Sequence, residues 1–541
     1  MGLRFKTIVG ACALFLACAA APCSAVDTEL AADLDGLKSS NFQVKNEAVT
    51  RIANSGAAQA YTVLHALLEG RLYVRRSDDG IVMAREHPAG LVDAASGADL
   101  GITDKGDLKK IIINNQMRGT LRVELARLSL RAPDPGVRRR AVESLLNSLT
   151  TETGELLRAA RAEERHRGVK ATLDIALALI DLESSDRGRR RAAVETLSGS
   201  MHAEVRNRLV ALLDTDASGM PREADAEVRR TAAAAVERID RMRTWFGLAE
   251  TALFGLSLGS VLVLAAAGLA ITFGVMGVIN MAHGELMMLG AYATWGVQQA
   301  MPEHLELSLF AAIPVAFLVA ASTGIAIERC VVRFLYGRPL ETLLATFGVS
   351  LILQQSVRTI FSPLNRAVAT PDWMSGQLVV NDALAITYNR LYIIIFSIAV
   401  FLALVSILRF TTLGLQIRAV AQNRGMARAM GVRGDWIDAI TFGLGSGVAG
   451  LAGVALSQLT NVGPNLGQSH IVDSFMVVVF GGVGNLWGTL VAGLSLGVAN
   501  KFLEPYAGAV LAKIFVLVLI ILFIQRYPRG LFPQRGRSAE A

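Results

Sequence analysis

Apolar segments long enough to cross a bilayer follow one another through the second half of the chain. They run from Trp245 to Gln525 and predict spans at about 248–272, 283–300, 307–327, 342–361, 391–409, 437–457, 474–500 and 508–525. Hydrocarbon offers no hydrogen-bond partner to an open backbone, so such segments cross a membrane as helices. The pattern therefore predicts a polytopic helical membrane domain.

Two of these apolar stretches, at 274–285 and 480–488, are interrupted by glycines and polar side chains. The polar residues concerned are Asn280, His283, Glu285 and Asn485. Broken helices at membrane depth face protein or water rather than lipid, and they are typical of transporters. We therefore expect all four side chains to line a translocation pathway. The alternative is that Asn280 caps the next helix and that the His283 imidazole bonds a backbone carbonyl.

The distribution of arginines predicts the orientation of the spans. Loops 328–341 and 410–436 carry most of them and should be cytoplasmic. If the N-terminal region lies outside, eight simple crossings would leave the basic tail after Arg526 outside as well. Two half-helices at 477–488 that enter and return on one side would bring the tail inside, so we expect a re-entrant hairpin there.

Residues 1–25 resemble a cleaved secretory signal peptide. Arg4 and Lys6 precede an apolar run from Ile8 to Ala21, and small residues follow at 23–25. An uncleaved membrane anchor is the alternative. In either case the residues that follow are expected on the periplasmic side.

The next segment, 26–243, has a helical and polar composition. Similar helix starts recur at Val44, Val137, Gly188 and Val228, a spacing that favours HEAT-type helical repeats. Helices rich in alanine and arginine can imitate this pattern without forming repeats. Short β-like pieces within 73–106 have the character of an insertion. The predicted fold class is therefore all-α, with a soluble extracytoplasmic domain ahead of the membrane domain.

The sequence lacks the residues and motifs that several classes of function require. The chain has a net charge of +7, but aromatic residues do not alternate with its basic residues, which argues against a nucleic-acid partner. Cys330 is the only cysteine after residue 25, and neither a metal-ligand spacing nor a Cys/His nucleophile pair occurs. We therefore expect no catalytic residues, no metal and no cofactor.

Glycine motifs do not indicate a nucleotide site either. Residues 445–450 satisfy the spacing of a dinucleotide-binding loop, but no strand precedes them. We interpret their neighbours Gly443, Gly447, Gly450 and Gly453 as a surface for close helix packing. No phosphate-binding loop occurs, so ATP hydrolysis would require a separate polypeptide.

A polar helix-turn segment at 414–432 lies between two predicted spans on the cytoplasmic side. Its small residues Ala421, Ala427 and Gly431 would allow it to seat in a groove of a partner protein. The alternative is a basic loop that only obeys the positive-inside rule.

Three motifs resemble the permeases of branched-chain amino acid type ABC importers. They are residues 273–285, the Arg418-Ala…Asn…Ala…Gly431 loop and residues 480–489, and the resemblance covers 248–535. Within that family, the extra N-terminal domain and the loop Thr370–Gly376 look most like the urea transporter permease. The resemblance implies a multi-pass bacterial inner-membrane subunit that is not itself an enzyme. It also implies a second permease, two cytoplasmic ABC ATPases and a periplasmic solute-binding protein as partners.

The family's ATPase-docking helix maps onto Ala421, Asn423, Ala427 and Gly431. We therefore expect a signal peptide at 1–25, an extracytoplasmic domain at 26–243, a transmembrane permease domain at 244–530 and a cytoplasmic tail at 531–541. The expected function is ATP-driven import of urea by alternating access. Open alternatives are a permease for branched-chain amino acids or short amides, a passive urea channel, and a membrane-anchored helical-repeat interaction protein.

Overall fold

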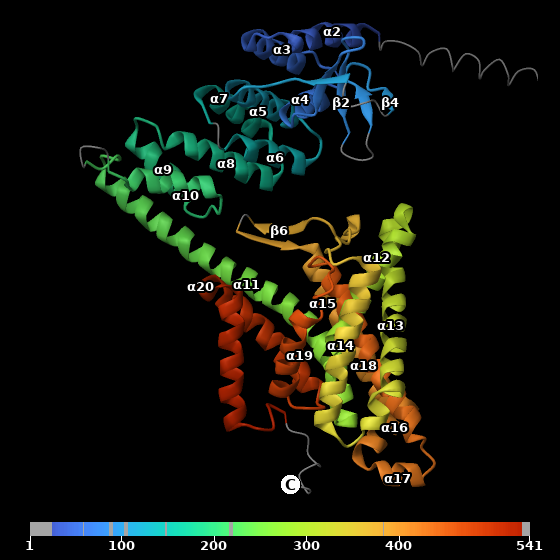
Figure 1. Ribbon diagram of the computed structural model, residues 1–541. Helices are drawn as coiled ribbons and strands as arrows, with labels where there is room; N and C mark the ends of the chain where they lie inside the picture. The colour runs from blue at the N-terminus through green and yellow to red at the C-terminus, as the bar shows by residue number, and fades with distance from the viewer. Residues whose placement is uncertain are drawn as a thin grey trace, which may run out of the picture. The chain divides into compact units, whose positions relative to one another are not determined.

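The computed structural model describes residues 24–57, 59–85, 90–101, 107–146, 149–215, 220–381 and 383–532 (Figure 1). The chain divides into two compact units, residues 1–242 and 243–541, and each is described by itself. The predicted signal segment up to residue 23 and the tail from residue 533 lie outside the described residues.

Helices form most of the first unit. They are α2 (Ser24–Asp35), η1 (Gly36–Lys38), α3 (Phe42–Asn54), α4 (Ala60–Leu68), α5 (Asn115–Ser129), α6 (Pro135–Leu145), α7 (Thr151–Glu163), α8 (Arg167–Asp181), α9 (Arg187–Leu197) and α10 (Ala203–Leu213). Several begin at an Asn or Asp whose side chain accepts a hydrogen bond from the first turn, as Asn114, Asp134 and Asp186 do. Leucine, valine and alanine on their inner faces form the core, with Leu145 and Val194 fully buried.

Segment 72–110 folds as a five-stranded antiparallel sheet in the order β4-β3-β2-β1-β5. The strands are β1 (Leu72–Arg75), β2 (Ile81–Ala84), β3 (Leu91–Asp93), β4 (Asp99–Gly101) and β5 (Leu108–Lys110). The all-α fold class is wrong for this segment. The three inner strands β1, β2 and β3 are short and mainly apolar, and a turn such as Asp78-Asp79-Gly80 lets neighbouring strands pair as an antiparallel hairpin.

Two arginines in the first unit make the same set of contacts. Arg138 in α6 donates two hydrogen bonds to the carboxylate of Glu164, at 2.8 and 3.0 Å, and others to the carbonyls of residues 132 and 133. Arg190 in α9 does the same with Glu223, at 2.9 and 3.0 Å, and with the carbonyls of residues 184 and 185. Each arginine follows a helix-capping aspartate by four residues. The same spacing therefore places both guanidinium groups against the two carbonyls that precede the cap.

The second unit contains the apolar helices, and the first of them, α11, begins among the residues of the first unit, at 226–242. Its elements are α11 (Ala226–Met276), α12 (His283–Ala300), η3 (Pro302–His304), α13 (Leu305–Cys330), η4 (Val332–Leu335), α14 (Pro339–Phe361), η5 (Asp372–Met374), β6 (Gln377–Asn381), β7 (Leu384–Thr387), α15 (Tyr388–Phe410), α16 (Thr412–Gln422), α17 (Arg424–Ala429), α18 (Gly434–Ser457), α19 (Gln468–Gly481) and α20 (Leu486–Arg526). Within the described residues, six of these helices are long and apolar enough to cross a membrane. They are α11, α13, α14, α15, α18 and α20.

The last two predicted spans are divided differently in the structure. The predicted span 474–500 is wrong as a single helix, because α19 ends at Gly481 and α20 begins at Leu486. α20 then continues through residue 526 with a kink at Gly508, where φ is 77°. With 14 residues, α19 is about 21 Å long, which is short of the hydrocarbon thickness and suits a half-helix. α20 ends at the same end of this unit as α16 and α17 (Figure 1).

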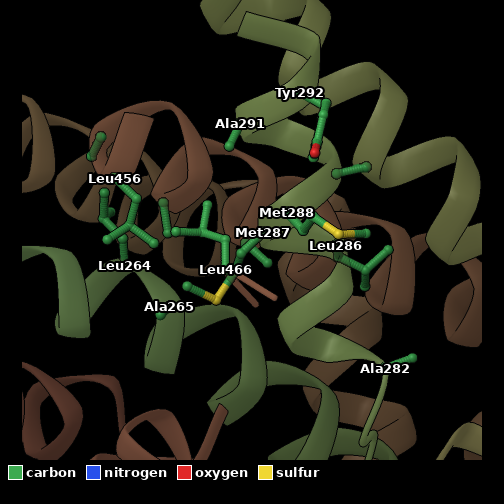
Figure 2. Packing of buried hydrophobic residues seen from close by; sticks show 14 of the residues in the cluster. Leu264, Ala265, Ala282, Leu286, Met287, Met288, Ala291, Tyr292, Leu456 and Leu466 are labelled. Carbon is green, nitrogen blue, oxygen red and sulfur yellow. The ribbon is translucent and has the colours of Figure 1, made fainter. Parts of the chain in front are cut away.

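Close helix packing in this unit depends on glycine, as expected for α18. A Cβ atom added at Gly450 would lie 2.6 Å from the Cβ of Ala320, and one at Gly453 would lie 2.0 Å from the carbonyl oxygen of Met287. The predicted glycine packing surface is therefore confirmed. Around it, Figure 2 shows Met287 and other α12 side chains among apolar residues of neighbouring helices.

Candidate functional site

The first helix break lies between α11 and α12. Gly277 has φ 69°, and Asn280 ends the irregular stretch by accepting a hydrogen bond from the backbone N–H of Ala282 at 3.0 Å. The Asn280 side chain is fully buried, and its Nδ2 has no hydrogen-bond partner in the part of the chain that the structure describes. This bond closes a turn within the break, because α12 begins at His283 after Ala282 and no side chain caps its first turn. The capping alternative for Asn280 is therefore wrong, and the donor end of its side chain has no partner among the described residues.

His283 and Glu285 start α12 and are also buried. The Nε2 of His283 donates to the backbone carbonyl of Ala265 at 2.8 Å, which is the structural alternative that the sequence left open. One oxygen of Glu285 accepts a hydrogen bond from the hydroxyl of Ser350 at 3.1 Å. The other oxygen of Glu285 and the Nδ1 of His283 have no hydrogen-bond partner among the described residues.

The second helix break, between α19 and α20, ends in a side-chain cap at Asn485. Gly482 and Gly484 have φ 104° and 79°, and the Asn485 side chain accepts hydrogen bonds from the N–H groups of Trp487 and Gly488 at 3.1 and 3.2 Å. Its Nδ2 donates to the carbonyl of Phe532 at 3.2 Å. Both breaks therefore combine a left-handed glycine with an asparagine whose side chain accepts a backbone hydrogen bond, and of the two only Asn485 caps the helix that follows.

The two breaks approach each other through glycine. A Cβ added at Gly274, near the end of α11, would lie 2.5 Å from the Cα of Gly484. A cavity of about 640 Å³ opens beside this contact. Its lining includes Gly274, Arg409, Arg418, Ala421, Asn485 and Trp487. It brings predicted pathway residue Asn485 and predicted coupling residue Ala421 together, whereas Asn280, His283 and Glu285 are not part of its lining.

The predicted coupling segment forms α16 and α17, at the opposite end of this unit from β6 (Figure 1). The Asn423 side chain caps α17 by accepting from the N–H of Met426 at 2.9 Å. The Ala427 side chain of α17 is buried, whereas Gly431 is exposed and has a φ of 85°. Met426 and Met430, which were not singled out from the sequence, are 62% and 78% exposed. Adaptable methionine side chains therefore form part of the outer surface here.

A charged network connects this segment to the bundle. Arg424 of α17 is paired with Asp438 of α18, a residue that is 1% exposed, and its guanidinium lies 3.9 Å from the ring centre of Tyr336. Arg428 donates to Asp435 at 2.6 Å. Sequence reasoning missed these positioning residues, although acidic residues at the start of an apolar span facing an arginine-rich loop were a usable signal.

Comparison with known proteins agrees with this geometry. The family profile described as the permease component of branched-chain amino acid transport systems matches residues 251–524. The high-affinity branched-chain amino acid transport system permease protein LivH of Escherichia coli is 31% identical over 287 residues, which cover 51% of this chain and 92% of LivH. The corresponding protein BraD of Pseudomonas aeruginosa is 29% identical over 287 residues, covering 51% of this chain and 93% of BraD.

A more distant relative is the ribose import permease protein RbsC of Escherichia coli, 26% identical over 253 residues that cover 45% of this chain and 75% of RbsC. No solved structure matches the chain. The chain belongs to the branched-chain amino acid permease family. It is the permease component of an ABC importer of this type, and it is not itself an enzyme.

Proposed function

We propose that this chain moves urea across the bacterial inner membrane by alternating access. The observation that carries the proposal is a set of buried polar atoms beside the first break that have no hydrogen-bond partner among the described residues, namely Asn280 Nδ2, His283 Nδ1 and Glu285 Oε2. Buried polar groups are nearly always hydrogen-bonded, so such a group indicates a missing partner. Urea is small and neutral and carries both donors and acceptors, which suits this mixture of amide, imidazole and carboxylate.

Each candidate residue has a proposed role. Asn280 and Glu285 bond the solute, while His283, whose Nε2 is committed to Ala265, orients the start of α12. Asn485 belongs to the cytoplasmic part of the route, where it lines the cavity.

The proposed ATPase-docking residues are Ala421, Asn423, Ala427 and Gly431. Asn423 shapes the turn and Gly431 leaves room for the partner. The proposed assembly contains a second permease, two cytoplasmic ABC ATPases and a periplasmic solute-binding protein. In this proposal the N-terminal unit is periplasmic.

A branched-chain amino acid is the second candidate solute. It is favoured by LivH and BraD, which are branched-chain amino acid transport permeases of the same family as this chain. Competition separates the two candidates. If leucine in excess fully blocks uptake of labelled urea, or if leucine is taken up instead, the urea assignment is wrong.

The decisive experiment is uptake of labelled urea by nitrogen-starved cells with and without this gene, with ATP depletion as the control. Loss of saturable, ATP-dependent uptake on deletion supports the importer. Gene-dependent flux that continues without ATP supports a passive channel instead. If uptake of urea, amides and amino acids is unchanged, and deletion of 26–243 abolishes binding of a partner protein, the chain acts as a membrane-anchored interaction protein.

A further inference from the structure

One face of α14 carries a polar residue at every fourth position. The residues are Thr342, Thr346, Ser350, Gln354 and Arg358. Residues four apart lie above one another on a helix, and this row is about 24 Å long at 1.5 Å per residue. It therefore extends through most of a hydrocarbon layer of about 30 Å. We call this row and the side chains bonded to it the α14 seam.

The opposite side of α14 has a different character. Its exposed large hydrophobic residues are Leu340, Leu344, Phe347, Leu351, Ile352 and Ile360, and exposed polar residues occur only toward the two ends of the helix, as at Gln355 and Ser356. Thr342, Thr346 and Gln354 are instead buried. A membrane helix that needed only to be anchored would be apolar on all sides, so the polar row serves something inside the protein.

At its lower half the α14 seam meets the first helix break. The hydroxyl of Thr346 accepts a hydrogen bond from the N–H of Met281 at 3.1 Å and also bonds its own helix at the carbonyl of Thr342, 2.8 Å away. Met281 follows Asn280, whose Nδ2 is unpartnered among the described residues. α14 thus lies directly against the irregular backbone of the break.

Above this point each residue of the polar row faces a polar side chain of another segment. Ser350 donates to Glu285 at 3.1 Å, and Gln354 donates to Gln468 of α19 at 3.4 Å. Arg358 donates to Asn465 at 2.7 Å. Separate side-chain hydrogen bonds, spaced one helical turn apart, therefore connect α14 to α12 and to the residues around the start of α19.

These bonds are suited to exchange. They join side chain to side chain, so a solute can replace one partner without opening a helical backbone bond. The Gln354–Gln468 bond is long, and one oxygen of Glu285 is unpartnered within the described structure. As adhesion between helices such bonds contribute little, because separated helices in a membrane also find polar partners.

We propose that the α14 seam is the solute route, with Ser350, Gln354 and Gln468 as solute-contacting residues. The solute class is a small uncharged molecule with N–H donors and a carbonyl acceptor, which takes the place of the Ser350–Glu285 and Gln354–Gln468 bonds in turn. This inference rests on the proposed transport function and adds residues from α14 and α19 to it.

Cysteine accessibility in the complete transporter tests the route. Cys12, Cys18, Cys23 and Cys330 are first replaced by serine, and Ser350→Cys or Gln354→Cys is then introduced. Their matched controls are Ser356→Cys and Gln355→Cys, on the exposed faces of the same helix. A thiol reacts as its thiolate, which lipid disfavours, so a charged methanethiosulfonate reagent should label positions 350 and 354 roughly tenfold or more faster than the controls.

Saturating urea should slow labelling at 350 and 354 and leave the controls unchanged. Equal labelling of both pairs, or no labelling at 350 and 354 in a transporter that takes up urea, would overturn the route while leaving the proposed function standing. Labelling at 350 and 354 that leucine slows and urea does not would support the route and refute urea as the solute.

Transport kinetics give a second readout. Glu285→Gln, Ser350→Ala and Gln354→Leu should raise the KM for uptake roughly tenfold or more, with normal amounts of protein in the membrane, because each loses a solute contact. Ser356→Ala and Gln355→Leu should transport as wild type. Equal effects from both groups would show that polarity anywhere on α14 matters and would contradict a defined route.

Discussion

The two units of this protein hold their helices together by opposite means. In the first unit, Arg138 and Arg190 reach across to Glu164 and Glu223, and the charges lie at the edges of an apolar core. In the second unit, glycines such as Gly290 and Gly450 let one helix backbone approach another within contact distance. This difference in helix packing matches the surroundings predicted from composition, which are water for the first unit and lipid for the second.

In the aqueous surroundings that its polar composition predicts for the first unit, burial of leucine and valine is favourable, so side chains of any matching size can hold its helices together. Between helices in lipid that driving force is missing, because lipid tails are as apolar as leucine. Association then depends on dispersion contacts and weak polar bonds at short range. Small residues then determine which helices pack together, and polar residues that packing does not need are available for function.

The largest effect is expected from filling a glycine contact in the membrane unit. Gly290→Leu in α12 should abolish assembly of a folded protein, because a Cβ there would lie 2.1 Å from the carbonyl oxygen of Gly450. The yield of monodisperse protein in detergent measures this. Gly296→Leu on the same helix is the control, since a Cβ there meets nothing within 4 Å. Equal yields for the two variants would refute the packing argument.

Gly431→Arg tests a glycine whose role is proposed to be docking. It should reduce uptake to background while the protein remains inserted, because a bulky cation would separate the ATPase from α17. Gly431 has φ 85°, so Gly431→Asn is the matched control, as asparagine tolerates this conformation. Co-purification of the ATPase should be lost only with arginine. Normal co-purification with Gly431→Arg would contradict the docking role.

The Arg190–Glu223 pair tests the other half of the comparison. Arg190→Leu should weaken the local stability of α9 by about 2 kcal/mol, because it leaves a nearly buried carboxylate without its partner. Amide hydrogen exchange of α9 in the full-length protein measures the change. Arg189→Leu, at a side chain that is 70% exposed, should change it by less than about 0.5 kcal/mol. Similar effects of both variants would show that the pair does not hold the helices.

The smallest expected effect is a pH dependence in the first unit. Hydrogen bonds from Arg138 lower the pKa of Glu164 from 4.5 to about 2. Stability from this pair is therefore fully present above pH 4.5 and is lost as the pH falls toward 2. In Glu164→Gln, exchange protection of α8 should lose part of its acid dependence in that range, whereas exposed Glu163→Gln should behave as wild type. An unchanged profile for Glu164→Gln would show that other carboxylates control acid unfolding.

The positions of the helix breaks could be predicted because glycine and polar residues in an apolar run are local signals. The predicted break at 274–285 contains the observed gap between Met276 and His283, and the break at 480–488 contains the gap between Gly481 and Leu486. The last spans were predicted less well, because the predicted span 474–500 crosses the second gap. Gly508, where φ is 77°, divides α20 into two helical parts, and the predicted span 508–525 begins there.

The polar residues of the candidate site could be predicted from the sequence, but their hydrogen-bond partners could not. Asn280, His283 and Glu285 are identifiable as polar residues in an apolar context, but their neighbours Ala265 and Ser350 are 18 and 65 residues away in the chain. The polar row of α14 has a periodicity that was visible in the sequence. Its importance depends on which helix it faces, and helix periodicity alone does not contain that information.

By itself the sequence determined the two kinds of environment, the helical membrane domain, the places where helices break and the family, because composition, periodicity and motif spacing are local properties of a chain. Tertiary structure alone decided the pairing of the five strands, the contact between the two breaks, and which polar atoms were left without partners among the described residues. Those features depend on contacts between residues far apart in sequence, whose distances are set only when the helices pack.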